Sequence, residues 1–76
     1  MKLPTNIPEE LHVDLESDQV IKVDAKTDAT IQRAMIIVHR HCLQLSRMRE
    51  VTMQEAAKSW VDSGFAEIYR QHYRRV

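Results

Sequence analysis

The sequence has few of the residues that cross-link a chain or interrupt its regular structure. Its single cysteine, Cys42, excludes an internal disulfide, and one glycine and two prolines among 76 residues leave little room for long loops or disorder. The longest apolar run, residues 34–38, is far shorter than the roughly 20 residues that a membrane-spanning helix needs. We therefore expect one small soluble domain over residues 1–76, without a membrane span.

The N-terminal residues also lack the apolar stretch that a secretory signal contains. An unpaired cysteine without such a signal is typical of a reducing compartment. The expected location is therefore the cytoplasm.

Catalytic and metal-binding patterns are equally scarce. His39 and His41 are two residues apart, so on a helix they point to different flanks, and His41 cannot face its neighbour Cys42. Gly64 is the only glycine, so no glycine-rich loop can hold a phosphate or a cofactor. We expect no catalytic residue, no metal and no cofactor, and hence a protein that is not an enzyme.

The net charge of zero conceals an asymmetry between two parts of the chain. Residues 1–28 contain three basic and seven acidic residues, which gives a net charge of −4. Residues 29–76 contain eight basic and four acidic residues, which gives a net charge of +4. The two parts can neutralise each other within one fold, or the basic part can meet an anionic partner.

A long helical pattern follows Thr27 and Asp28, either of which is a natural N-cap. It predicts a helix over residues 28–49 with more apolar surface than a single packing partner would cover. The main apolar face comprises Ile31, Met35, Val38, Cys42 and Leu45. A smaller apolar face and a basic stripe lie on other sides, formed by Ile36 with Leu43 and by Arg33 with Arg40 and Arg47.

The most specific local signal is a capping box at Thr52 and Glu55, which can each bond the other's backbone amide. It predicts a second helix over residues 53–75 that forms an antiparallel hairpin with the first. Gly64 lies near the middle of the apolar arc of this helix, where we expect another backbone to approach closely. The alternative is a kink, with Ser63 capping a separate segment.

Residues 1–27 allow two interpretations. Residues 19–24 alternate in polarity and read as a strand, and residues 11–15 alternate as well, so that a turn at 16–18 would join them into a β-hairpin. Pro8 followed by two glutamates is instead typical of the first turn of a helix. We prefer the strand or hairpin by a small margin.

These elements predict an α+β fold that is mostly helical, with a strand or β-hairpin followed by an antiparallel two-helix hairpin. Two copies would give a four-helix core, which suits a chain too short to bury a large core alone. The surplus apolar faces therefore predict a homodimer or, failing that, a helix of another protein as partner. The expected dimer interface comprises Ile31, Met35, Ile36, Val38, Leu43, Leu45, Trp60 and Gly64.

Nucleic acid is the other partner class that the sequence suggests. The order strand, helix, capped turn, helix resembles that of the ribbon-helix-helix DNA-binding family, whose members are dimers. The resemblance implies that residues 19–24 form the ribbon, although the balanced overall charge is unlike that of a dedicated polyanion binder. The candidate anion contacts are Lys22, Lys26, Arg33, Arg40, Arg47, Arg70 and Arg74.

The function that the sequence favours is that of a small intracellular, non-enzymatic interaction or regulatory protein acting as a homodimer. The alternative is a dimeric DNA-binding regulator of the ribbon-helix-helix type. The alternative predicts an affinity that falls steeply with salt, because phosphate contacts release counterions.

Overall fold

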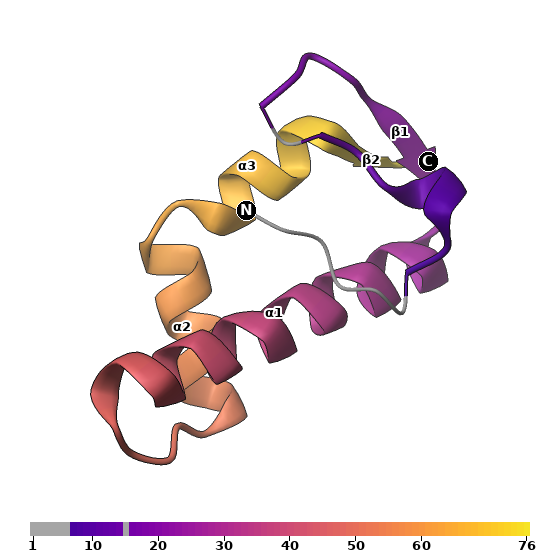
Figure 1. Ribbon diagram of the computed structural model, residues 1–76. Helices are drawn as coiled ribbons and strands as arrows, with labels where there is room; N and C mark the ends of the chain where they lie inside the picture. Colours follow the sequence, from indigo (N-terminus) through magenta and orange to yellow (C-terminus); the bar gives the residue numbers. More distant parts are fainter. Residues whose placement is uncertain (1–6, 15) are drawn as a thin grey trace.

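The computed structural model describes residues 7–14 and 16–76, which form helices beside a small sheet (Figure 1). A 3₁₀ turn, η1 (Glu9–Leu11), precedes strand β1 (Ile21–Val23). Helices α1 (Ala25–Arg47), α2 (Met53–Asp62) and α3 (Phe65–His72) follow, and strand β2 (Tyr73–Arg75) continues directly from α3. The expected α+β class is confirmed. No helix within the described residues is long and apolar enough to cross a membrane.

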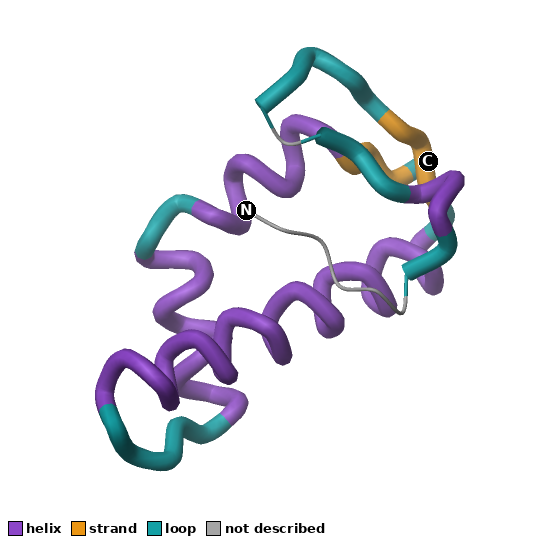
Figure 2. Tube along the Cα trace, viewed as in Figure 1, coloured by secondary structure: helices purple, strands orange, loops and turns teal. Residues whose placement is uncertain are grey.

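The expected β-hairpin is wrong, because β1 pairs with β2 and the two strands are parallel. Residues 12–14 form no strand, while Leu15 and residues 1–6 lie outside the described part of the chain. A parallel pair requires a long crossover connection, and the three helices provide it. Figure 2 shows the short sheet next to the N-terminal end of α1.

The N-cap of α1 is Asp24, one turn earlier than Thr27 or Asp28, the expected caps. The Asp24 carboxylate accepts a hydrogen bond from the Thr27 backbone amide at 2.7 Å. This bond lowers the pKa of Asp24, because it favours the charged form. With Asp24 in the capping position, Asp28 lies inside the first turn of α1 and is free to turn toward the interior.

One half of the capping box before α2 is confirmed, since the Thr52 hydroxyl accepts a hydrogen bond from the Glu55 backbone amide at 3.1 Å. The Glu55 carboxylate, expected to bond the Thr52 amide, accepts a hydrogen bond from Arg49. The single helix expected over 53–75 is wrong. The alternative of a kink is correct, but Ser63 does not cap the second segment: it is the C-cap of α2, and Gly64 is the N-cap of α3. Gly64 lies between α2 and α3 with φ of 85°, in the left-handed region that glycine adopts without strain. Apart from its immediate neighbours along the chain, no described atom lies within 4 Å of the place where a Cβ would be. The turn therefore explains this glycine, and the expected close approach of another backbone is absent from the described structure.

Aromatic side chains from three elements meet in the core. The Tyr69 ring stacks on Tyr73, with centroids 4.8 Å apart, and lies 5.9 Å from the Trp60 ring. The Tyr73 hydroxyl donates a hydrogen bond to the Leu11 carbonyl at 2.6 Å, which ties the segment around η1 to β2. The buried core cluster comprises Ile7, Val13, Val23, Ile31, Ala34, Met35, Trp60, Tyr69 and Tyr73.

This core corrects part of the expected dimer interface. Ile31, Met35 and Trp60 are each only 2% exposed within a single chain. They cannot contact a second copy unless the fold opens. The main apolar face of α1 is thus divided: its first half is used by the core, and its second half remains at the surface.

Replacing Gly64 by alanine should lower the free energy of unfolding by about 1–2 kcal/mol, because a Cβ is strained at this positive φ even with open space around it. Ser63→Ala is the matched control, since Ser63 has φ of −81° and ψ of −2°, which any residue adopts. It should change the free energy by less than about 0.5 kcal/mol. Urea denaturation followed by circular dichroism measures both. Equal losses in the two variants would contradict the backbone explanation.

Candidate functional site

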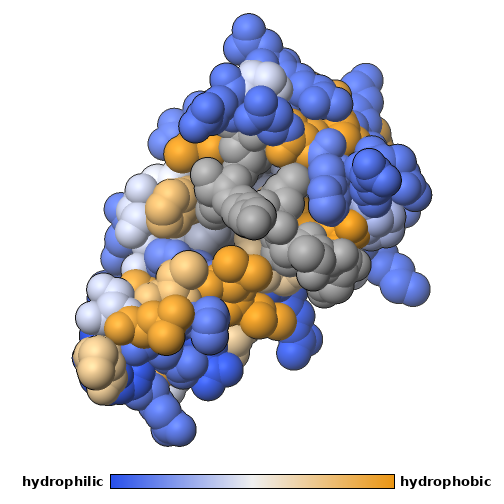
Figure 3. All heavy atoms as spheres, in the orientation of Figure 1, coloured by the Kyte–Doolittle hydropathy of each residue, from blue (hydrophilic) through white to orange (hydrophobic). Residues whose placement is uncertain are grey.

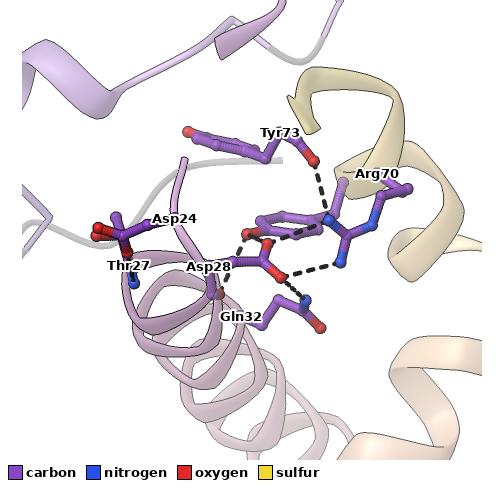
Figure 4. A network of polar contacts seen from close by, with 7 residues as sticks. Asp24, Thr27, Asp28, Gln32, Arg70 and Tyr73 are labelled. Atoms are coloured by element: carbon purple, nitrogen blue, oxygen red, sulfur yellow. Dashed lines mark hydrogen bonds and ion pairs between the residues drawn. The ribbon is translucent and has the colours of Figure 1, made fainter. Parts of the chain in front are cut away.

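Asp28 is a buried carboxylate in the first turn of α1, with only 3% of its surface exposed. One oxygen accepts a hydrogen bond from the Tyr69 hydroxyl at 2.5 Å, and the other accepts one from the Gln32 amide at 3.1 Å. Arg70 donates to both oxygens, at 3.3 and 3.1 Å, in a bidentate pair (Figure 4). The sequence marks Asp28 only as a possible cap and gives no sign of this network, because no local pattern links α1 to α3.

These bonds keep Asp28 ionised although it is buried. Burial by itself raises the pKa of the carboxyl, but hydrogen bonds from Tyr69, Arg70 and Gln32 together outweigh it and hold the pKa below its ordinary value. Burial, together with the bond to Asp28, raises the pKa of Tyr69 far above its ordinary value. The Tyr69 hydroxyl therefore stays a proton donor, and Asp28 stays an acceptor, at neutral pH.

Arg70 is held by contacts to three elements while part of its side chain reaches solvent. Besides the ion pair with Asp28, it donates a hydrogen bond to the Tyr73 carbonyl at 3.2 Å. Its guanidinium carbon also lies 5.3 Å from the centroid of the Tyr69 ring, a cation–π distance. The side chain remains 47% exposed. The guanidinium is therefore fixed in place and accessible from outside.

An open hollow of about 690 Å³ lies over this network, between α1, α3 and β2. Its lining is polar and rich in arginine. Of its two carboxylates, Asp28 is already neutralised by Arg70, and Glu67 is exposed. The lining residues are Asp28, Gln32, Glu67, Arg70, Gln71, Arg74 and Arg75.

A second hollow of about 620 Å³ adjoins the first, and the two share Asp28, Gln32 and Arg75. It lies between the first half of α1 and the start of α2. Arg33 and Gln54 are its further polar members. Its other lining residues are small or apolar: Ala25, Ala29, Ile36, Met53 and Ala57.

The sheet sets two like charges opposite each other. Lys22 on β1 pairs in register with Arg74 on β2, and both side chains are exposed. Like charges directly opposite each other in a sheet repel and are unfavourable. Among the described carboxylates, none forms an ion pair with Lys22, Arg74 or Arg75. The sheet therefore carries uncompensated positive charge next to the first hollow.

The arginine stripe predicted on α1 does not form one surface. The Arg40 guanidinium is half-buried and donates to the Val51 carbonyl, in the turn before α2. Arg47 is the last residue of α1 and lies beside Lys58 of α2. Arg33 lines the second hollow. Helical spacing predicts that these three residues share a side of α1. It does not predict that Arg40 binds the backbone of the turn before α2.

Three of the predicted anion contacts do come together. Arg70 and Arg74 line the first hollow, and Lys22 lies opposite Arg74 in the sheet. Arg75, which the prediction left out, joins them. Lys26 lies apart, in a smaller pocket next to η1.

The C-terminal half of α1 and its C-cap residue, Met48, present apolar side chains to solvent. Ile37, Leu45 and Met48 are 48%, 66% and 89% exposed, and Cys42 is exposed between them. Cys42 is therefore not the buried thiol that its place in the apolar pattern suggests. Figure 3 shows apolar atoms gathered over this part of the molecule. We refer to Ile37, Cys42, Leu45 and Met48 as the α1 face.

The other side of α1 packs toward α2. His39 Nε2 lies 3.0 Å from the Ser59 hydroxyl, and its ring meets Phe65 edge-on at 5.4 Å. Burial, and then the nearby charge of Arg47, lower the pKa of His39, so it is neutral at pH 7. Ile36 and Leu43 are half-buried on this side, and Val38 is half-buried between the two sides. These three residues therefore offer an interface only part of their surface.

No three His, Cys, Asp or Glu side chains among the described residues are grouped as a metal site requires.

Asp28→Asn preserves the shape of the side chain but removes its charge. We expect the free energy of unfolding to fall by about 2–4 kcal/mol, because the Arg70 guanidinium loses its charged acceptor. Asp62→Asn is the matched control, since it breaks only the exposed pair with Lys58, and it should cost less than about 0.5 kcal/mol. Similar losses in both variants would contradict a central role for Asp28.

The same network should make stability depend on pH in the acid range. The folded-state pKa of Asp28 lies below the unfolded value of about 3.9. Its contribution is therefore fully present above pH 4 and is lost as the pH falls through the folded-state pKa. Between pH 5 and pH 2, urea midpoints should fall more for the wild type than for Asp28→Asn. Parallel curves would show that other groups dominate.

Comparison with known proteins adds no further observation on these sites. No protein-family model matches the chain, and no curated protein or solved structure matches it either. Function is therefore inferred from the contacts, burial and charges of the described residues.

Proposed function

We propose that the protein is a small, non-enzymatic interaction or regulatory protein that acts as a homodimer, with the α1 face as the dimer interface. The supporting observation is the exposure of Leu45 and Met48, at 66% and 89%, together with Ile37 on the same helix. Single apolar side chains on a surface are ordinary, but several along one side of a helix are typical of an association site.

The backbone at Met48 supports the same proposal. Its φ of 55° lies in the left-handed region, where glycine is the usual residue after a helix. A residue with a Cβ costs about 1–2 kcal/mol there. The Met48 side chain is almost fully exposed, so its burial within the chain returns little of that cost. A partner on the α1 face would bury it.

A second copy of the chain has the geometry that this face requires. A two-fold axis would bring the same residues of both copies together, as in most homodimers. Because α2 packs on the other side of α1, the two copies would form a four-helix core.

DNA binding of the ribbon-helix-helix type has less support. Lys22 opposite Arg74 favours contact with phosphates. However, β1 is paired in parallel with β2 of the same chain, and a third helix intervenes between α2 and β2. The arrangement thus shares with that family the order of its first elements, while its sheet is built within one chain.

Leu45→Glu should weaken the dimer by at least about tenfold in dissociation constant, because a charge would be buried at the interface. Val20→Glu is the matched control: it places the same charge at an exposed valine, 47% accessible, just before β1. Sedimentation and light scattering at two concentrations and two salt strengths measure the mass. Circular dichroism confirms that both variants are folded.

The wild type and Val20→Glu should show a mass near twice 8.9 kDa, and Leu45→Glu should show 8.9 kDa at low concentration. A folded wild type that is monomeric in every condition would rule out the homodimer. A Leu45→Glu variant that dimerises like the wild type would rule out the α1 face as its interface.

A further inference from the structure

The two adjoining hollows offer different chemistry to one ligand. The first is polar and arginine-lined, and the second has small and apolar walls, while Asp28, Gln32 and Arg75 belong to both. A ligand that spans them would place an anionic group against the arginines and a flat apolar group against α1 and α2. Their volumes, about 690 and 620 Å³, lie in the range of small-molecule sites.

The arginines of the first hollow are suited to a phosphate. Arg70 is positioned by Asp28, so its remaining N–H groups are oriented before a ligand arrives. Arg74 and Arg75 form no ion pair with a described carboxylate, and Lys22 adds a further charge opposite Arg74. Glu67 is the opposing charge in this lining. Arg70 neutralises Asp28. Arg74 and Arg75 together outweigh Glu67, so the hollow has a net positive charge.

The second hollow suits a planar ring. Ala25 and Ala29 have small side chains, so they leave room for a ring against this side of α1. Met53 supplies a polarisable side chain that packs well against aromatic rings. The amides of Gln32 and Gln54 can each donate and accept hydrogen bonds at the edge of a base. Arg33 provides a guanidinium plane on which a base can stack.

We propose that these two hollows form one site for a nucleoside phosphate, with the phosphate bound by Arg70, Arg74 and Arg75 and the base bound between α1 and α2. Both a free nucleotide and a unit of single-stranded nucleic acid carry this chemistry. The residues that form the site lie outside the α1 face, so the proposal is independent of the homodimer.

The test is to titrate the full chain with three probes at low salt. They are adenosine monophosphate, a labelled single-stranded oligonucleotide and inorganic phosphate. Amide chemical shifts report the first and third, and fluorescence anisotropy reports the second. Mass measurements on the same samples record the oligomeric state separately, so failure of this site and failure of the dimer are distinguishable.

The variant for the phosphate side is Arg74→Ala with Arg75→Ala, and its matched control is Arg47→Ala with Arg49→Ala. Both remove two exposed arginines, but the control pair lies at and just beyond the C-terminal end of α1, away from β2. We expect the first to weaken binding at least tenfold and the second less than twofold. For the oligonucleotide, the first should also reduce the salt slope by about 1–2. Equal effects of the two variants would overturn the site.

Ala29→Leu tests the base side, because it fills the second hollow without changing charge or helix propensity greatly. It should weaken adenosine monophosphate at least fivefold and leave inorganic phosphate unchanged. Failure of both nucleoside probes to bind, or an Ala29→Leu variant that binds adenosine monophosphate like the wild type, would overturn the proposal.

The three probes also separate the two sources of the ligand. Competition of adenosine monophosphate for the bound oligonucleotide at comparable affinity would support a free nucleotide. Oligonucleotide binding without measurable binding of the mononucleotide would support a single-stranded nucleic acid. Equal affinity for inorganic phosphate and adenosine monophosphate would overturn a nucleoside-specific site.

Discussion

The ion pair of Asp28 with Arg70 constrains the whole fold. An ionised carboxylate is costly to bury unless its oxygens are bonded. Gln32 on α1 supplies one donor to Asp28, and α3 supplies the others through Tyr69 and Arg70. Those donors fix α3 on α1, and Arg70 extends the constraint to the Tyr73 carbonyl at the start of β2. The stacking of Tyr69 on Tyr73 and the register of β2 on β1 depend on that placement. The same bonds hold Arg70 in position at the first hollow.

Local signals in the sequence were sufficient for features that depend on neighbouring residues. The capping box identified the start of α2, and alternating polarity identified β1. The parts that could not be predicted depend on distant partners. Asp28 looks like a helix cap until Tyr69 and Arg70 are known to reach it. Residues 73–75 continue a helical pattern, and only their pairing with β1 makes them a strand.

The charged and apolar surfaces, like the fold, could be predicted only in part. Charge close to aromatic residues singled out Arg70 and Arg74, which the structure places at the first hollow. The stripe through Arg40 does not form, because that side chain donates to the Val51 carbonyl. On α1, apolar spacing marked Ile31 and Leu45 alike. The core is shorter than the helix, so it covers the first and leaves the second exposed. Periodicity gives the side of a helix, and the extent of the core decides which part of that side remains available.

The parallel sheet joins residues about fifty positions apart and so closes a loop that contains all three helices. Closing such a loop costs conformational entropy before the pairing is gained, whereas α1 and α2 meet across a short turn. Opening of β1 from β2 is therefore the natural low-energy route of partial unfolding. It would release β2, two of whose arginines line the first hollow, and leave the α1 face intact. The two surfaces of this small chain thus differ in how much of the fold must be present for each to exist.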